Sequence, residues 1–191
     1  DLYNSSNKGL SNIEIGEMLS RLKDYNLNYL SSEFFDCYGN FKKIDDLEIS
    51  LIGYHLDNSA CSRDNYPSEH PLTLCMIYKK DMILPEFSMQ TRSFFQNFYD
   101  LIYPKQSIII KEDNYFSSRF ILEGSDDTKI RDFFSSYIRR NAFLKNHKNY
   151  FYYKSDNNCL IVYRYNINND YNVNKQYELL ETALKIFKEI Q

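Results

Sequence analysis

Residues 84–164 read LPEFSMQTRS FFQNFYDLIY PKQSIIIKED NYFSSRFILE GSDDTKIRDF FSSYIRRNAF LKNHKNYFYY KSDNNCLIVY R. Helix-spaced phenylalanines alternate in this stretch with short runs of tyrosine, isoleucine and valine, which favour strands. Strands that pair locally, with helices between them, are typical of an α+β domain rather than of a doubly wound parallel sheet. The sequence therefore predicts an α+β fold, a mainly antiparallel sheet of about five to seven strands with about four helices packed against it.

Four segments have the apolar spacing of helices. Ser11 and Glu14 form a capping box before a helix predicted over 12–25, with a stripe of Ile15, Met18, Leu19, Leu22 and Tyr25. A second helix is predicted over 91–102, capped by Thr91 and carrying Phe94, Phe95, Phe98, Leu101 and Ile102.

A third helix is predicted after Gly124, with Asp126 and Asp127 in its first turn and Arg139 and Arg140 at its basic end. The side chains predicted to face inward are Ile130, Phe133, Phe134, Tyr137 and Ile138. The last helix spans 173–190, and its predicted apolar seam is Val173, Tyr177, Leu180, Leu184 and Phe187.

The predicted strands lie between these helices. Residues 47–56 and 72–79 are expected to form an antiparallel pair joined by the long polar loop 57–70. Two extended pieces are predicted at 107–111 and 115–123. Segments 149–154 and 159–165 flank the turn-rich residues Ser155, Asp156, Asn157 and Asn158, which predicts a β-hairpin.

Composition limits the classes of function. A chain of 191 residues is long enough for one domain with its own core, and residues 1–191 are predicted to form a single α+β domain. The net charge of −3 gives no general electrostatic footprint for nucleic acid. The longest apolar runs, such as 108–110, are far shorter than a bilayer span, so the chain is predicted to be soluble. Because it begins with Asp1 rather than Met, we expect a fragment of a longer chain.

The four cysteines, Cys37, Cys61, Cys75 and Cys159, are widely spaced and contain no Cys-x-x-Cys pair. This spacing argues against a zinc ribbon and against a thioredoxin-type redox site. Free thiols in a reducing compartment are the expectation, with a disulfide framework as the alternative.

Several segments resemble the C-terminal soluble part of a group of bacterial membrane-anchored proteins in which a transmembrane hairpin precedes an α+β domain. The matching segments are LPEFSM at 84–89, FSSRFILEGSDD at 116–127, IRDFF at 130–134 and LIVYR at 160–164. The resemblance implies a tether to a bacterial membrane, with this domain on the cytoplasmic side. It supplies no activity and no catalytic residues. This chain lacks the anchor, and its loop 57–70 lacks the Gly/Ser character of the group.

Catalytic signatures are few. There is no Gly-rich phosphate loop, no Gly-x-Ser-x-Gly elbow and no His-Glu-x-x-His. The alternative hypothesis of a small hydrolase or transferase depends on Cys61 and His70 in the long loop, where a thiol and an imidazole lie beside Asp64 and Glu69. His55 and Cys75 are expected within strands, as structural residues. No cofactor and no metal are predicted.

The most suggestive surface is basic and aromatic. Its predicted binding residues are Arg139, Arg140, Lys145, Lys148, Tyr150 and Tyr152, next to His147, Phe151 and Tyr153. Such residues bind protein partners, anionic lipid headgroups or single-stranded nucleic acid, and the acidic balance elsewhere makes nucleic acid the least favoured. The alternative is a helix end, a solvated turn and an ordinary strand. The preferred hypothesis is a non-catalytic, membrane-associated binding domain that uses this surface or the C-terminal helix.

Overall fold

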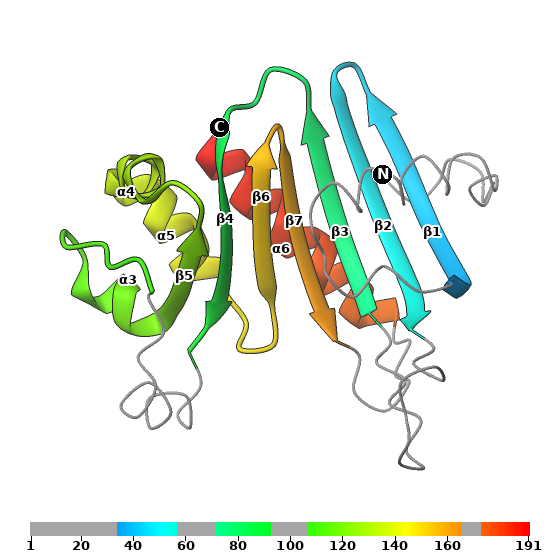
Figure 1. Ribbon diagram of the computed structural model, residues 1–191. Helices are drawn as coiled ribbons and strands as arrows, with labels where there is room; N and C mark the ends of the chain where they lie inside the picture. Colours follow the sequence, from blue (N-terminus) through cyan, green and yellow to red (C-terminus); the bar gives the residue numbers. More distant parts are fainter. Residues whose placement is uncertain (1–33, 57–71, 93–106, 166–172) are drawn as a thin grey trace, which may run out of the picture.

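A computed structural model describes residues 34–56, 72–92, 107–165 and 173–191, which form a seven-stranded sheet and four helices (Figure 1). The strands are β1 (Phe34–Ile44), β2 (Leu47–Leu56), β3 (Leu72–Lys79), β4 (Leu84–Thr91), β5 (Phe120–Gly124), β6 (Tyr152–Asn157) and β7 (Cys159–Tyr165). The helices are α3 (Asn114–Arg119), α4 (Asp127–Ser135), α5 (Tyr137–Asn146) and α6 (Val173–Ile190). The predicted α+β class with an antiparallel sheet is confirmed.

The strands lie in the order β1-β2-β3-β7-β6-β4-β5, and every neighbouring pair is antiparallel. The β6–β7 hairpin therefore lies between β3 and β4, although β3 and β4 are close in sequence. The backbone N–H of Lys79 donates to the carbonyl of Asn158 over 3.0 Å, which joins the end of β3 to the hairpin turn. This pairing makes one continuous sheet out of strands from both halves of the chain.

The register assigns each strand residue to one of two faces. One row across six strands consists of directly paired neighbours, namely Leu51, Cys75, Val162, Tyr153, Met89 and Leu122. All six side chains are buried in one hydrophobic cluster. Because side chains alternate along a strand, the next row along, Ile52, Leu74, Tyr163, Tyr152, Gln90 and Ile121, points to the opposite face. We call these the helix face and the second face.

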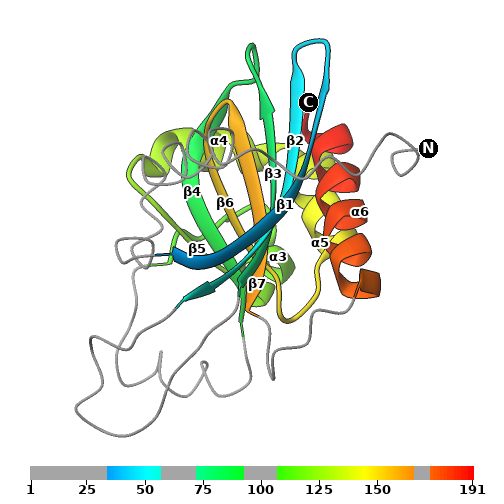
Figure 2. The same cartoon turned by 90° about the vertical axis from the view of Figure 1, so that its right-hand side faces the viewer.

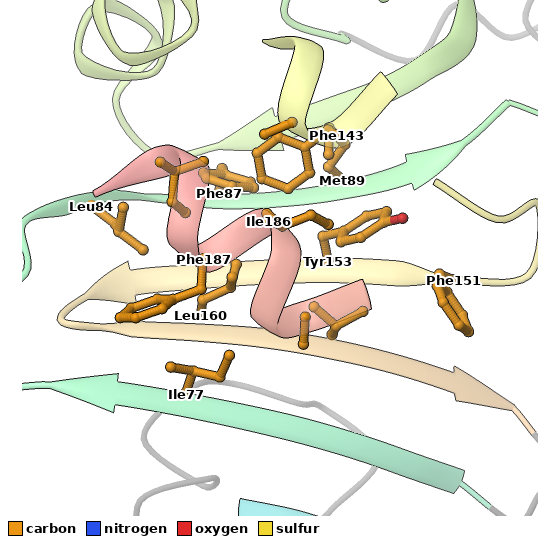
Figure 3. Close-up of a cluster of buried hydrophobic side chains, with 14 of the residues drawn as sticks. Ile77, Leu84, Phe87, Met89, Phe143, Phe151, Tyr153, Leu160, Ile186 and Phe187 are labelled. Carbon is orange, nitrogen blue, oxygen red and sulfur yellow. The ribbon is translucent and has the colours of Figure 1, made fainter. Parts of the chain in front are cut away.

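All four described helices contribute to the core on the helix face. Phe116 of α3, Phe134 of α4, Phe143 of α5 and Ile186 of α6 belong to the same cluster of buried residues as the strand row. Figure 3 shows Phe143, Ile186 and Phe187 packed over Met89, Tyr153 and Leu160. Figure 2 shows α5 and α6 together on one side of the sheet. Burial of an aromatic or leucine side chain stabilises a fold by about 1.5–3 kcal/mol, so this cluster dominates the stability of the described part.

Two hairpin turns contain the described non-glycine residues with positive φ. Asp45, between β1 and β2, has φ 55°, and Asn157, the last residue of β6, has φ 44°. Asp and Asn tolerate this left-handed region better than other non-glycine residues because their short side chains bond to local backbone. The predicted pairing of 47–56 with 72–79 is confirmed, and so is the β-hairpin predicted within 149–165. Its first strand starts at Tyr152 rather than at 149, and Ser155 and Asp156, predicted in the turn, pair with Leu160 and Cys159, so the turn is shorter than predicted. The β1 strand was not predicted.

The prediction of extended structure over 115–123 was wrong for its first half. Residues 114–119 form α3, because the Asp113 side chain caps it by accepting from the Phe116 N–H at 2.8 Å. Ser117 Oγ also accepts from the Ile110 N–H at 2.9 Å. Residues 107–110 form no regular strand, but the Ile108 N–H donates to the Leu122 carbonyl beside β5.

The third predicted helix is two helices. The chain breaks at Ser136, so Tyr137 and Ile138 start α5 and are exposed rather than inward-facing, and Arg139 and Arg140 lie in its first turn. The last helix has the predicted bounds, but its buried face is Leu179, Thr182, Ala183, Ile186, Phe187 and Ile190, and Tyr177 is exposed. Thr91 ends β4 instead of capping a helix. Residues 93–102 and the 12–25 prediction lie outside the described residues.

The helices in the described part of the chain are all too short or too polar to cross a membrane.

Candidate functional site

Arg140, predicted as a surface binding residue, is buried at the α4–α5 junction. Its Nη1 donates to the carbonyls of Phe134 and Ser135 at 2.6 and 2.7 Å, and its Nε donates to Asp113 Oδ2 at 2.9 Å. These carbonyls belong to the last turn of α4, where backbone acceptors have no helical partner. Arg140 thus caps α4 from the following helix and pairs with the residue that caps α3. Its guanidinium is not available to a partner.

Arg139 and Lys145 remain nearer the surface. The Arg139 guanidinium lies over the Phe133 ring, 4.5 Å from its centroid, and Nη1 donates to the Phe133 carbonyl at 3.4 Å. Lys145 is exposed in the last turn of α5, where a cation is favourable for the helix dipole. His147 Nδ1 is bonded to the Leu144 carbonyl at 2.7 Å, and its ring meets the edge of Phe120. His147 therefore has a structural role at the end of α5.

Lys148, Tyr150 and Glu178 form a polar contact between the segment before β6 and helix α6. The Tyr150 hydroxyl donates to one Glu178 oxygen at 2.8 Å, and Lys148 Nζ lies 3.1 Å from the other. The guanidinium of Arg164, from β7, lies 5.2 Å from the Tyr150 ring centroid. Arg164 is only 6% exposed, and its Nε has no hydrogen-bond partner. Two of the predicted binding residues thus bind the chain's own helix.

The electrostatics of Glu178 reflect these contacts. Partial burial works to raise the pKa of the Glu178 carboxyl, but the hydrogen bonds from Tyr150 and Lys148 and the charges of Lys148 and Arg164 outweigh it, so the pKa is lowered. The pKa of the Tyr150 hydroxyl is raised, first by desolvation and then by its bond to Glu178. Glu178 is therefore ionised and Tyr150 protonated at neutral pH. In these states the Tyr150 hydroxyl can donate its hydrogen bond to the Glu178 carboxylate.

The aromatic residues that follow are divided between the two faces of the sheet. Phe151 and Tyr153 are buried in the core of the helix face. Tyr152 lies on the second face and stacks on Tyr163, with centroids 5.2 Å apart and rings inclined by 19°. The basic and aromatic residues predicted to form one surface are thus distributed over a buried ion pair, a helix contact and a strand pair.

Exposed apolar side chains also occur on α3, on α5 and in the segment before α3, at the α3–α5 end of the molecule. They are large side chains that are more than half exposed: Ile109 (55%), Tyr115 (61%), Tyr137 (68%) and Ile138 (62%). The Asp113–Arg140 ion pair and a bond from Arg131 Nη1 to the Ile109 carbonyl hold residues 109–115 to the α4–α5 junction. Figure 1 shows α3, α4 and α5 grouped beyond β4 and beside β5. We call these four residues the α3–α5 surface.

Cations flank this surface. Lys111 and Lys129 are exposed, and Arg131 and Arg139 are half-buried. Lys129 pairs with Asp126 at 3.2 Å and Arg131 with Asp127 at 3.4 Å, and both pairs lie at the solvent-exposed surface, where an ion pair stabilises a helix only weakly. An incoming acidic group competes with such weak pairs at little cost. Apolar side chains bordered by exchangeable cations suit a partner with an apolar centre and acidic rim.

The catalytic alternative depends on two residues that the structure does not describe. Cys61 and His70 lie outside the described residues, and His55 lies in β2. Cys75 is a free, fully buried thiol on the helix face, as predicted for a core residue, and Cys159 is fully buried too. Within the described ranges, no three His, Cys, Asp or Glu side chains are arranged to hold a metal ion.

Sequence reasoning missed the α3–α5 surface because it assigned Tyr137 and Ile138 to the buried stripe of a single long helix. The signal was Ser135-Ser136, two residues that favour helix caps over helix interiors. Arg164 and Glu178 were missed because they approach Tyr150 only through the fold. Comparison with known proteins adds no guidance: no family model, curated protein or solved structure matches this chain significantly.

Proposed function

We propose that this chain is a non-catalytic binding domain that takes a protein partner on the α3–α5 surface. The observation that supports this proposal is the group of four large, exposed apolar side chains held at one end by buried contacts. Exposed Tyr and Ile are enriched in recognition patches when they occur together, whereas single exposed apolar residues are ordinary. Ile83, in the β3–β4 connection, is such a single residue, although it is 89% exposed.

The surface is pre-organised, which strengthens the proposal. Tyr137 and Ile138 lie in the first turn of α5, and Arg140 of the same turn is fixed by three hydrogen bonds. Tyr115 lies in α3, whose first turn is capped by Asp113. Little conformational entropy is then lost when a partner binds, because the backbone that presents these side chains is already ordered.

The decisive experiment is photo-crosslinking in the cells that make the protein. A benzophenone amino acid at position 138 is compared with the same group at position 83, and the partner crosslinked only from position 138 is purified. Binding of that partner is then measured by calorimetry. We expect the Tyr137→Ser/Ile138→Ser variant to bind at least about tenfold more weakly, which corresponds to 1.4 kcal/mol, and Ile83→Ser to bind normally. Equal binding by all three proteins would exclude the α3–α5 surface.

The second candidate is attachment to anionic lipid headgroups, favoured by the adjacency of exposed Ile138 to Arg139 and by the basic residues Lys111, Lys129 and Lys145. Apolar side chains beside cations insert at a bilayer interface. Co-sedimentation with phosphatidylserine vesicles, compared with phosphatidylcholine vesicles, tests it. Binding to the anionic vesicles that is lost in Tyr137→Ser/Ile138→Ser and in Arg139→Glu/Lys145→Glu would replace the protein partner by a membrane. Absence of vesicle binding favours the protein partner.

A further inference from the structure

We draw no further inference here: the strongest candidate, the apolar part of the second face of the sheet formed by Ile52, Leu74, Met76 and Ile161 on β2, β3 and β7, carries none, because nothing in the described part of the chain shows what covers it.

Discussion

At the scale of single residues, Arg140 connects three helices through one guanidinium. It bonds the last carbonyls of α4 from within α5 and pairs with Asp113, which caps α3. The side chain of Arg140 is 7% exposed and that of Asp113 is 18% exposed, so water replaces neither partner well. Removing one side chain of this ion pair would leave the other charge buried without a partner, which lowers the free energy of unfolding.

We predict that Arg140→Met lowers the free energy of unfolding by about 3–5 kcal/mol, because Asp113 and two carbonyls lose their donor in a buried site. Urea denaturation followed by circular dichroism measures the change. Arg139→Met is the matched control: its neighbouring guanidinium is half-buried against Phe133, and we expect a loss of at most about 1 kcal/mol. Equal losses for the two variants would contradict the buried role of Arg140.

Adding Asp113→Asn to Arg140→Met extends the test. An asparagine removes the buried negative charge but keeps an oxygen that can cap α3. The double variant should therefore be less destabilised than the sum of the two single variants, with a coupling of about 1–3 kcal/mol. Additive losses would show that the two side chains act independently.

Glu178 gives the contact between Tyr150 and α6 a dependence on pH. Its pKa is lowered in the folded protein from the ordinary value of 4.5, so its stabilising effect is present above that value and is lost as the pH falls through the folded pKa. We predict that Glu178→Gln is less stable than the native chain at neutral pH, by about 0.5–1 kcal/mol after solvent screening, and that the difference shrinks below pH ~4.5. Thermal melts from pH 7 to 3 measure it. Glu181→Gln, on the exposed side of α6, should show a smaller and flatter difference.

At the scale of elements, the residues at the helix caps determine where α3 and α5 begin, and the apolar spacing of the sequence alone predicted these boundaries wrongly. Residues 115–119 begin with Tyr and Phe, which favour strands, yet they are helical because the Asp113 side chain accepts from the Phe116 N–H in the first turn of α3. Ser136 divides α4 from α5 although the apolar spacing runs through it, and the fold compensates with Arg140, 4 residues later along the chain. The β6–β7 hairpin was predictable because Asp156, Asn157 and Asn158 favour a turn between two strand-forming segments, although Ser155 and Asp156 are paired within the hairpin.

Gly124 joins β5 to the start of α4, and the backbone there passes very close to β4. A Cβ at this position would collide with the Glu86 carbonyl oxygen and with the Ile130 side chain. We predict that Gly124→Ala destabilises the protein by about 1–3 kcal/mol, because backbone must move to accept the methyl group. The midpoint of thermal unfolding measures it. Ser125→Ala removes only an exposed hydrogen bond to Glu86 and should change stability by less than about 1 kcal/mol.

At the scale of the whole molecule, the sheet order explains how much could be predicted from sequence. The fold class, the hairpins and the bounds of α6 can be predicted from the local spacing of apolar and turn-forming residues. The insertion of β6 and β7 between β3 and β4 does not, because it depends on pairing of Cys75 with Val162, 87 residues apart in the chain. For the same reason the residues of the predicted basic surface lie in separate places in the structure. Tyr150 contacts Glu178 and Arg164 only after the sheet and α6 have assembled.

The central position of Cys75 makes it a reporter for global unfolding. It is fully buried in the strand row of the helix face, and burial, with a smaller effect of the neighbouring Cys159, raises the pKa of its thiol. We predict that iodoacetamide modifies Cys75 at pH 8 only at the rate at which the whole domain opens. Mass spectrometry of peptides quantifies each cysteine separately. Modification of Cys75 that is not accelerated by sub-denaturing urea would show that a local opening exposes it.

The short connection between β3 and β4 has a consequence for how the protein is made. On the ribosome, β3 and β4 emerge together, but they are not neighbours in the sheet, and the hairpin that belongs between them is completed only about 70 residues later, at β7. Until then both strands present unpaired edges and apolar side chains, the condition in which chains associate wrongly. A nascent chain stalled before residue 150 should therefore depend on chaperones, and a chain released after residue 191, in which α6 also covers the core, should not. The vulnerable period of this protein is set by the interval between synthesis of β4 and arrival of the hairpin.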